Sequence, residues 1–400
     1  MNRRISVLIV FALFAVACAP EEAVESTTTA APETTTSTTS TTTTVPPTTT
    51  STIPPFTVEG APPGLAATIE GFYAYASGEA AKPPLIVKPV LQSIKPGPVE
   101  TPRSGKAWTG TFKGDGVATA KMGDDIFLAV NRGKGWRIVG GKWPSLSIPN
   151  YFGPQPRLVA VVGSDARPGE DILATRTDSI HFVGLDGAGR GGILGIPRDS
   201  WVPIAGGGSS KINAALSLAG TDGMMETFRD LSGLPLEGYV MTGFAGFEEM
   251  IGAVLGNFEL FVPEPMHDTA SKANFEAGPQ VVDGNEALAF SRTRKTLPNG
   301  DFDRSANQGL LMLDVMRDLK EKGYRSIPGL MELSEPFMMT DLNAQELLTF
   351  AALTIASNPE WIPNVVAPGG SGWAGSASVV HLSDSASELW ADLADGRLGG

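Results

Sequence analysis

Acidic and basic residues gather where three apolar runs of the sequence end. The runs are Leu158 to Val162, Ile180 to Val183 and Ile193 to Ile196. Runs of this kind, rich in Val and Ile and stopped by turn residues, are typical of strands buried on both faces. The charged residues beside them are Asp165, Arg167, Arg176, Asp178, Arg198 and Asp199. Charges at the ends of buried strands are costly unless they meet a ligand, a metal or each other, so we expect a functional site here.

A second polar group lies in the last third of the chain and contains Arg292, Arg294, Asp301, Arg304 and Gln308. Arg292 and Arg294 are two residues apart, so in an extended stretch both side chains point the same way. Arg304 and Gln308 are four residues apart, so they share one face of a helix. Guanidinium groups keep their charge and form forked hydrogen bonds, which suits a phosphate or pyrophosphate.

The two groups together predict an anion site that also holds a cation. The aspartates beside the arginines are the ligands that a hard cation such as Mg²⁺ needs, usually alongside phosphate oxygens. The competing interpretation is a set of structural ion pairs on a solvated surface. It fits any single pair, but not so many charged residues at strand ends. We therefore expect several guanidinium groups in one pocket.

Strands that alternate with helices must position these residues. Helical patterns follow the third apolar run, among them 222–232, 244–255 and 303–322, and Asp283 to Glu286 has the spacing of a capping box. This alternation predicts an α/β fold, an α/β/α sandwich with a largely parallel sheet. The Pro- and Gly-rich segment 368–375 is predicted to be a loop before a closing helix.

The segment 56–150 predicts a small N-terminal α+β accessory domain. A helical pattern at 65–77 is followed by short strand-like runs with Gly- and Asn-rich ends, as in hairpins. No residues here have the spacing of a catalytic group. The main domain is predicted at 154–395.

Residues 1–18 resemble the signal peptide of a bacterial lipoprotein. A basic start precedes an apolar stretch that is too short for a comfortable membrane span, and Cys18 follows small residues, as a lipidated cysteine does. Residues 19–55 are mostly Thr, Ser, Pro and Ala and predict a disordered tether. We expect an extracytoplasmic protein, anchored as a lipoprotein to the outer face of the cell membrane. A cleaved ordinary signal and an uncleaved anchor are the alternatives.

Composition excludes several classes of function. A net charge of −13 argues against non-specific binding to nucleic acid. Cys18 is the only cysteine, which excludes disulfides within the chain and thiolate metal sites. His181, His267 and His381 have neither metal-ligand spacing nor a serine in a nucleophile elbow, so a hydrolase triad is not expected.

The order and spacing of the charged motifs resemble the LytR-CpsA-Psr family of bacterial cell-envelope proteins. The motifs, within roughly 156–393, are Gly163-Ser164-Asp165-Ala166-Arg167, Arg176-Thr177-Asp178-Ser179, Ile196-Pro197-Arg198-Asp199-Ser200, Lys211-Ile212-Asn213, Arg292-Thr293-Arg294 and the series Asp301, Arg304, Gln308. Each motif alone is weak, but the full series in this order is specific. The resemblance implies an α/β/α sandwich with an apolar groove for a lipid tail. It also implies a phosphotransferase that uses Mg²⁺ and moves a glycopolymer from a polyprenyl-pyrophosphate carrier to peptidoglycan as a phosphodiester.

The resemblance further implies roles for single residues. By position, Arg198, Arg292, Arg294 and Arg304 would hold the pyrophosphate, Gln308 would hydrogen-bond to it, Asp165 and Asp178 would face Mg²⁺, and Asp301 would orient the arginines. The predicted substrate-binding set also includes Arg167, Arg176, Asp199, Lys211 and Asn213. Phosphoryl transfer depends mainly on positioning and on charge stabilisation by arginine and metal, which agrees with these residue types. Which aspartate takes the proton of the attacking hydroxyl stays open.

The apolar groove has candidate residues too, in Leu255, Phe258, Leu260 and the helix after Gln308, most of which we interpret as core. Two features depart from the family pattern. Asn307, Gln308 and Gly309 stand where an arginine and two glutamines are common, so one positive charge is missing. Cys18 and the tether also stand in place of the transmembrane helix that is typical of relatives.

Two rival functions remain. A polyprenyl- or nucleotide-pyrophosphatase would use the same residues with water in place of the sugar hydroxyl. A non-catalytic protein that binds polyprenyl phosphate or glycan would fit the missing arginine. A transcriptional role is not favoured, because the chain is acidic, exported and without a DNA-binding pattern.

Overall fold

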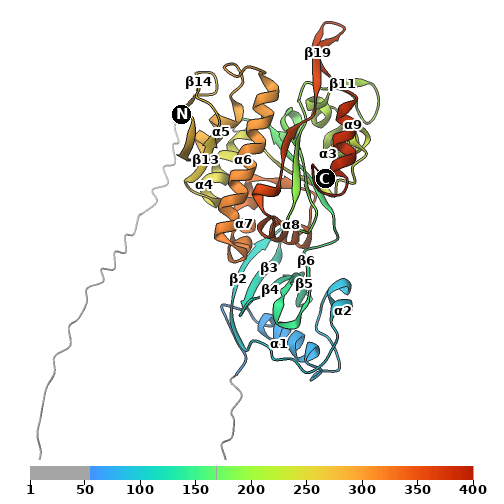
Figure 1. Ribbon diagram of the computed structural model, residues 1–400, viewed down its shortest axis with the longest axis vertical. Helices are drawn as coiled ribbons and strands as arrows, with labels where there is room; N and C mark the ends of the chain where they lie inside the picture. The colour runs from blue at the N-terminus through green and yellow to red at the C-terminus, as the bar shows by residue number, and fades with distance from the viewer. Residues whose placement is uncertain (1–54, 168, 400) are drawn as a thin grey trace, which may run out of the picture. The chain divides into compact units, whose positions relative to one another are not determined.

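Two six-stranded sheets organise the computed structural model, which describes residues 55–167 and 169–399 (Figure 1). The predicted signal peptide, Cys18 and the predicted tether up to residue 54 lie outside the described residues. Among the helices of the described part, none has the length and apolar character needed to cross a membrane.

The first sheet, called the N-terminal sheet, contains in spatial order β1 (Thr57–Glu59), β2 (Ser104–Phe112), β3 (Asp115–Met122), β4 (Asp125–Asn131), β5 (Trp136–Trp143) and β6 (Ile148–Tyr151). All neighbouring pairs are antiparallel except β1 with β2. The helix α1 (Leu65–Ala76) packs on this sheet, where Phe72 meets Phe127 and Trp143 at ring-centroid distances of 5.1 and 5.3 Å. A short helix, α2 (Lys88–Ser93), follows. The predicted small α+β arrangement of this segment is confirmed.

The second sheet, called the central sheet, has the strand order β17 (Met339–Thr340), β12 (Gly238–Thr242), β7 (Arg157–Ser164), β8 (Thr177–Leu185), β9 (Gly191–Gly195) and β18 (Asn364–Val366). Only β12–β7 and β9–β18 are parallel, and the other three pairs are antiparallel. The prediction of a largely parallel sheet is therefore wrong. The connections between β7, β8 and β9 contain no crossover helix, and a parallel pair needs a long crossover.

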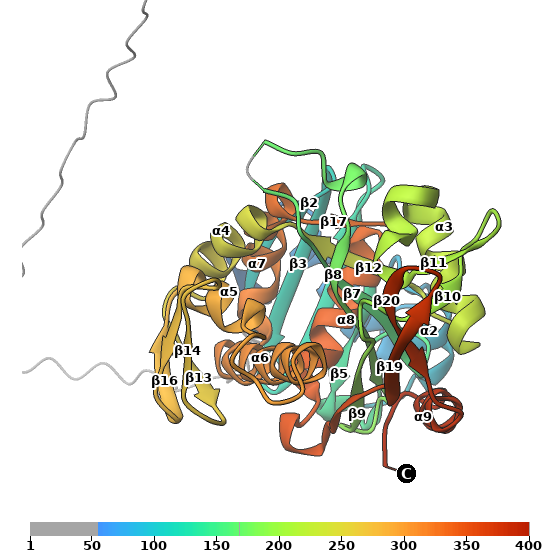
Figure 2. The same cartoon turned by 90° about the horizontal axis from the view of Figure 1, so that it is seen from above.

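Helices cover both faces of the central sheet, so the predicted α/β/α sandwich is confirmed (Figure 2). On one face, Phe182 of β8 packs against Phe228 of α3 (Ala215–Ser232) and Trp390 of α9 (Ser385–Leu393). On the other face, residues of β8 and β9 share a core with α6 (Asp301–Lys322) and α8 (Ala344–Ala356). Both faces are buried, which explains why apolar runs alone did not distinguish parallel from antiparallel pairing.

The two sheets share one hydrophobic cluster through α8 and α7 (Ile327–Ser334). Arg157 fixes this junction from the start of β7, with a side chain that is 1% exposed. Its Nε donates to both carboxylate oxygens of Glu237 at 2.6 and 2.8 Å, and its Nη1 donates to the carbonyl of Phe152 and the hydroxyl of Thr349. Segment 55–151 therefore packs on the sandwich through polar as well as apolar contacts.

Two glycines bring α6 close to the central sheet. A Cβ on Gly195, at the end of β9, would lie 2.3 Å from Ser305 Oγ of α6. A Cβ on Gly309 of α6 would overlap the side chain of Asn364, the first residue of β18. Because neither position has room for a side chain, the first turns of α6 lie against the ends of β8 and β9.

Smaller elements surround this frame. Beyond α6 lie α4 (Phe244–Val254), α5 (Gly284–Arg292) and the strand pairs β13 (Phe258–Val262) with β16 (Gly278–Val282) and β14 (Met266–Asp268) with β15 (Ala273–Phe275). The capping box predicted at Asp283 and Glu286 is confirmed at the start of α5. Two further hairpins are β10 (Trp201–Pro203) with β11 (Ser209–Lys211) and β19 (Gly369–Ala374) with β20 (Ala377–Leu382). The loop predicted at 368–375 is thus wrong, since most of it is the strand β19.

Candidate active site

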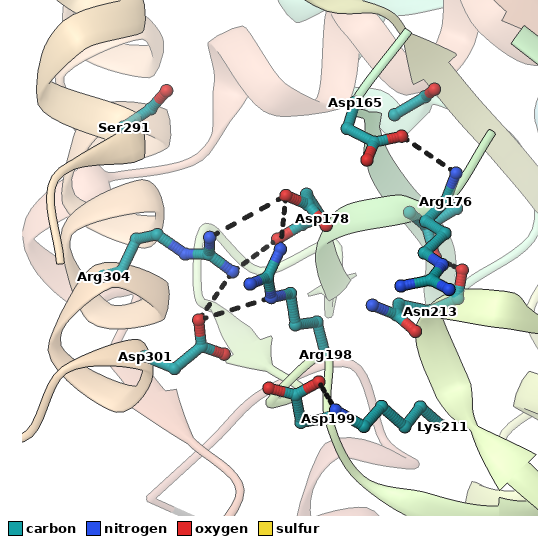
Figure 3. Close-up of polar contacts among 12 residues, drawn as sticks. Asp165, Arg176, Asp178, Arg198, Asp199, Lys211, Asn213, Ser291, Asp301 and Arg304 are labelled. Carbon is teal, nitrogen blue, oxygen red and sulfur yellow. Dashed lines mark hydrogen bonds and ion pairs between the residues drawn. The ribbon is translucent and has the colours of Figure 1, made fainter. Parts of the chain in front are cut away.

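Two arginines and two aspartates form an ion cluster where β8, β9 and α6 meet (Figure 3). Arg198 follows β9 and its Nη1 lies 2.5 Å from Asp178 Oδ2 of β8. Arg304, in the first turn of α6, places Nη2 2.7 Å from Asp301 Oδ1 and 3.0 Å from the carbonyl oxygen of Asp178. Two longer contacts complete the cluster. Arg198 Nε lies 3.7 Å from Asp301 Oδ1, and Arg304 Nη1 lies 3.9 Å from Asp178 Oδ2. We call these four residues the central cluster.

The central cluster keeps unused hydrogen-bonding capacity. Arg198 Nε, Arg304 Nε and Asp178 Oδ1 are buried without a hydrogen-bond partner among the described residues. Buried polar atoms of this kind are usually paired, so exceptions point to a missing ligand, ion or water. Burial disfavours the charged form of both arginines, whereas the carboxylates of Asp178 and Asp301 favour it.

The balance differs between the two guanidinium groups. Burial lowers the pKa of Arg304, and repulsion from Arg198 and Arg294 adds to this effect. For Arg198, attraction to Asp178, Asp301 and Asp199 outweighs burial and raises the pKa. Both side chains remain protonated, because an arginine is not deprotonated in proteins. An incoming anion would relieve the repulsion between the arginines.

A cavity of about 1170 Å³ extends from the central cluster into the apolar interior. Its polar end is lined by Asp165, Asp178, Arg198, Arg294 and Arg304, among others. Its interior is lined by side chains of α4, α6 and α8, among them Phe247, Met312, Val315, Met316, Leu319 and Phe350. Small-ligand sites usually measure roughly 300–1,000 Å³, so this cavity suits a long ligand with one charged end.

The helix after Gln308 therefore does line an apolar groove. Leu255, Phe258 and Leu260 instead lie in the buried core beside it, as we expected for most of these candidates. The difference depends on which face of α6 is involved. One face points to the central sheet and borders the cavity, whereas β13 packs behind α6.

Most of the other predicted site residues border the cavity. They are Arg167, Arg176, Arg292, Arg294 and Gln308. Asp165 follows β7, and its Oδ1 accepts a hydrogen bond of 2.9 Å from the backbone N–H of Arg176. Gln308 Nε2 donates to the carbonyl of Ser291 at 2.9 Å, which ties α6 to α5. Arg292 is the last residue of α5, not part of an extended stretch, and its guanidinium lies 4.5 Å from the ring centroid of Phe244.

Four predicted site residues do not border the cavity, and one of them is Asp301 of the central cluster. Asp199 and Lys211 form an ion pair of 2.7 Å on the far side of Arg198 (Figure 3). Asn213 is buried, and its backbone N–H donates to the carbonyl of Arg198, so it supports the loop that carries Arg198. Asn307, which stands in place of the usual arginine, lies against Met266 of the core and not against the cavity.

Asp268, at the end of β14, is a cavity residue that the sequence did not reveal. Burial would raise the pKa of Asp268, but backbone hydrogen bonds from Ala270, Arg294 and Lys295 outweigh it and hold the pKa below its usual value. The ionised carboxylate therefore fixes the backbone of the loop after α5, which carries Arg294. No motif signals this role, because Asp268 lies 26 residues before Arg294 and contacts only its backbone.

His181 connects two of the elements that form the site. Its side chain is fully buried, and burial lowers its pKa to about 4, so the ring is neutral at pH 7. One ring nitrogen lies 3.2 Å from Ser179 Oγ, and the other lies 3.0 Å from the carbonyl oxygen of Ser305 in α6. A neutral ring that donates to that carbonyl and accepts from the hydroxyl satisfies both contacts. His181 therefore joins β8 to α6.

Asp165 and Asp178 suit a cation whose remaining ligands come from substrate and water. Within residues 55–167 and 169–399, no three acidic or histidine side chains form a closed metal site. Both aspartates border the polar end of the cavity, and Asp178 Oδ1 is free of protein partners there. Mg²⁺ commonly binds through one or two carboxylates plus phosphate oxygens, so the donor set fits this ion.

Comparisons with known proteins agree with this geometry. A model of the LytR_cpsA_psr family matches residues 148–394. The probable cell wall biosynthesis protein LcpB of Corynebacterium glutamicum is 38% identical over 177 residues, which cover 41% of this chain and 42% of that protein. The polyisoprenyl-teichoic acid–peptidoglycan teichoic acid transferase TagV of Bacillus subtilis is 37% identical over 142 residues, 33% of this chain and 36% of that protein. The chain thus spans less than half the length of either relative.

A solved structure extends the similarity over more of the chain. The crystal structure of B. subtilis TagV superposes with a TM-score of 0.51 and 26% sequence identity. The superposition covers 60% of this chain and 95% of the TagV chain.

Proposed function

This chain belongs to the LytR-CpsA-Psr family, and we propose that it is a phosphotransferase that attaches a glycopolymer to peptidoglycan. The donor in this proposal is the glycopolymer on a polyprenyl-pyrophosphate carrier, and the product is a phosphodiester on a sugar hydroxyl of peptidoglycan. The name of TagV, a teichoic acid transferase, supports the same class of reaction, and the name of LcpB, a probable cell wall biosynthesis protein, supports the same process.

The main support for the proposal is the set of side chains that line the cavity. One continuous space joins an arginine-rich end to an interior lined by apolar side chains of α4, α6 and α8. A polyprenyl pyrophosphate has the same two parts, a doubly charged head and a long apolar tail. Burying the tail removes apolar surface from water, while the arginines bind the head through charge-assisted hydrogen bonds.

The proposed reaction is a displacement at phosphorus. The oxygen of the acceptor hydroxyl forms a bond to the phosphorus that carries the glycopolymer, and the bond from this phosphorus to the bridging oxygen breaks. Polyprenyl phosphate leaves with the bridging oxygen and its electron pair. Arg198 and Arg304 stabilise the charge on that oxygen through their Nε–H groups, which have no hydrogen-bond partner among the described residues. The proton of the hydroxyl passes to a carboxylate at the polar end of the cavity.

Mg²⁺ is proposed as the cofactor, with Asp165 and Asp178 as its protein ligands. When bound, the ion would neutralise charge on the phosphate oxygens. We also propose that the protein acts outside the cytoplasm and that a lipid on Cys18 holds it at the membrane, where polyprenyl carriers lie.

The test is reconstitution of the transfer with the full-length protein in detergent. The protein is incubated with a polyprenyl-pyrophosphate glycan, Mg²⁺ and a soluble peptidoglycan oligomer, and the products are analysed by mass spectrometry. We expect a glycan joined to the oligomer by a phosphodiester. Arg198→Ala should abolish this product. Arg190→Ala is the matched control, because Arg190 is about half exposed and pairs with Asp186 at the opposite end of β8 and β9.

Other outcomes would change the proposal in defined ways. Release of polyprenyl phosphate and glycan phosphate without a linked product would identify a pyrophosphatase. Tight co-purification of lipid without turnover would identify a binding protein. Activity that persists in EDTA would contradict the role of Mg²⁺ but not the transfer itself.

A further inference from the structure

The hairpin of β19 and β20 is attached directly to the loop of the candidate active site. The backbone N–H of Val380 in β20 donates to the carbonyl of Asp199 at 2.9 Å, and Ser200 forms a parallel β-bridge with Val380. Asp199 follows Arg198 in the chain and pairs with Lys211. The base of the hairpin is therefore joined to the loop that carries Arg198.

Trp373 is the most exposed large hydrophobic side chain of the described residues, at 71%. It lies opposite Ser378 in the hairpin, and Ser371 lies two residues before it on the same face of the strand. Both serines are exposed. The neighbours on the other face are Gly372 and Ala374, which are too small to cover the indole ring. We call Ser371, Trp373 and Ser378 the hairpin platform.

The chemistry of the hairpin contrasts with that of the cavity. No Asp, Glu, Lys or Arg occurs between residues 361 and 383, although the adjoining loop carries Arg198 and Asp199. A surface without charge offers little to a phosphate or to a charged peptide. An exposed aromatic face flanked by hydroxyl groups instead suits a sugar ring, whose C–H face packs on the indole while its hydroxyls bond to serine. Tryptophan supplies such an area at low cost in conformational entropy.

The position of the platform also fits an acceptor rather than a donor. The cavity is lined by residues of α5 and α6 and by none of β19 or β20. The hairpin lies on the side of the central sheet where α3 and α9 are found (Figure 2). From Val380 to Ser378 the strand advances by about 7 Å, at roughly 3.4 Å for each residue. Trp373 therefore lies about one or two sugar units from the loop that carries Arg198.

We propose that the hairpin platform binds the glycan strand of the acceptor and so positions its hydroxyl group for attack. The ligand class is a neutral N-acetylated hexosamine chain, with Trp373 stacked on one ring. This inference rests on the proposed function, because it assigns the second substrate of that reaction to a surface outside the cavity. Trp373 is in this sense a positioning residue and takes no part in bond making or breaking.

The experiment separates acceptor binding from donor chemistry. Full-length wild-type protein, Trp373→Ala, Trp373→Phe and Trp361→Ala are compared. Trp361 is a suitable control, since it is 59% exposed and lies near Gly189, at the opposite end of β9 from Arg198. Binding of soluble glycan strands that carry no glycopolymer is measured by calorimetry in the absence of carrier. Transfer is then measured while acceptor and carrier are varied in turn.

We expect Trp373→Ala to raise the Kd for glycan strands, and the KM for acceptor, about tenfold, with the KM for carrier unchanged. Trp373→Phe should restore much of the loss, and Trp361→Ala should behave as wild type. Equal acceptor binding and KM in Trp373→Ala and wild type would overturn the inference while leaving the proposed transferase intact. Glycan binding that depends on Trp373 in a protein without transfer would support the platform and reject the proposed function.

A membrane role is the remaining explanation for an exposed tryptophan, and the same variants test it. Co-flotation with vesicles of phosphatidylglycerol and phosphatidylethanolamine is measured for each protein. Vesicle binding that is lost in Trp373→Ala, with glycan binding unchanged, would assign the hairpin to the lipid surface and overturn the inference.

Discussion

Two carboxylates, the buried Asp125 in the N-terminal sheet and the partly buried Asp178 in the central sheet, lie in polar clusters of opposite kinds. Asp125 is 0% exposed and uses both oxygens: Oδ2 accepts from the hydroxyls of Tyr73 and Ser145, and Oδ1 accepts from the backbone N–H of Ser145. Asp178 directs Oδ2 to two arginines and leaves Oδ1 without a partner among the described residues.

The difference separates a stabilising cluster from a binding cluster. Around Asp125 the donors and acceptors match, and burial together with the hydrogen bond to Asp125 raises the pKa of Tyr73, so this cluster holds its protons at any physiological pH. Around Asp178 the donors and acceptors do not match, since Arg198 Nε, Arg304 Nε and Asp178 Oδ1 all lack a hydrogen-bond partner among the described residues. Buried groups without partners cost stability, and a protein retains them where a ligand completes the set. Breaking the first cluster should therefore affect folding, and breaking the second should affect activity.

The largest effect is expected for Arg198→Ala. It should lower the rate of transfer by about 10³-fold or more, because a charge that stabilises the phosphoryl transition state is lost. The free energy of unfolding, measured with denaturant, should change by less than about 1.5 kcal/mol, since Arg304 remains beside Asp178. If Arg198→Ala instead unfolded the protein while Arg190→Ala did not, the central cluster would be structural and the comparison would fail.

Asp125→Ala should show the opposite pattern. Removing the acceptor leaves Tyr73 and Ser145 buried without partners and should lower the free energy of unfolding by about 3 kcal/mol. The transfer rate, measured well below the melting temperature, should stay near that of wild type. Asp124→Ala is the matched control, because Asp124 is the adjacent and exposed carboxylate. A large loss of transfer in Asp125→Ala at a temperature where the variant is folded would show that the two clusters are coupled.

His181 should make stability depend on pH. Its pKa of about 4 in the folded protein lies below the unfolded value of about 6.5, so the unfolded chain binds a proton first as the pH falls. The stabilisation that the neutral ring gives to the folded protein is fully present above pH 6.5 and is lost as the pH falls towards 4. Between pH 6.5 and 5 the free energy of unfolding should fall by about 2 kcal/mol from this cause. Denaturation of wild type and His181→Gln across this range should give a steeper slope for wild type, and equal slopes would refute the neutral ring. His267→Gln, at an exposed histidine, should match wild type.

The smallest effect is expected for Asp268→Asn. The backbone N–H groups of Arg294 and Lys295 would lose an ionised acceptor, which should loosen the loop that carries Arg294. We expect the KM for the polyprenyl carrier to rise about fivefold, equivalent to about 1 kcal/mol, with a smaller change in kcat. Steady-state kinetics with Glu264→Gln as a surface control test this. A change in kcat alone would mean that Asp268 acts in the chemical step.

Much of the local structure could be predicted from the sequence. The strands around Leu158–Val162 and Ile180–Val183, the capping box at Asp283 and the helix after Asp303 depend on residues within one strand or one turn, so their patterns are visible in the chain. The same is true of the residue types of the central cluster, since arginine and aspartate at strand ends already indicate an anion site.

The hairpin at 369–382 could not be predicted from such local patterns. Its glycines, and Pro368 just before it, are typical of a loop, yet pairing between the strands and the bond from Val380 to Asp199 make it a β-hairpin. A segment of this composition has little strand preference of its own, so its conformation depends on contacts that it forms in the folded protein.

The sequence by itself thus determined which segments form strands and helices, and which residues could bind an anion. Only the tertiary structure decided that β7, β8 and β9 pair antiparallel, that α6 lies against β9 at Gly195, and that one face of α6 borders an apolar cavity. Arg304 meets Asp178 across 126 residues of chain, and Arg198 meets Asp178 across 20. Local preferences act over a few residues, whereas these contacts form only when burial of apolar surface brings distant segments together.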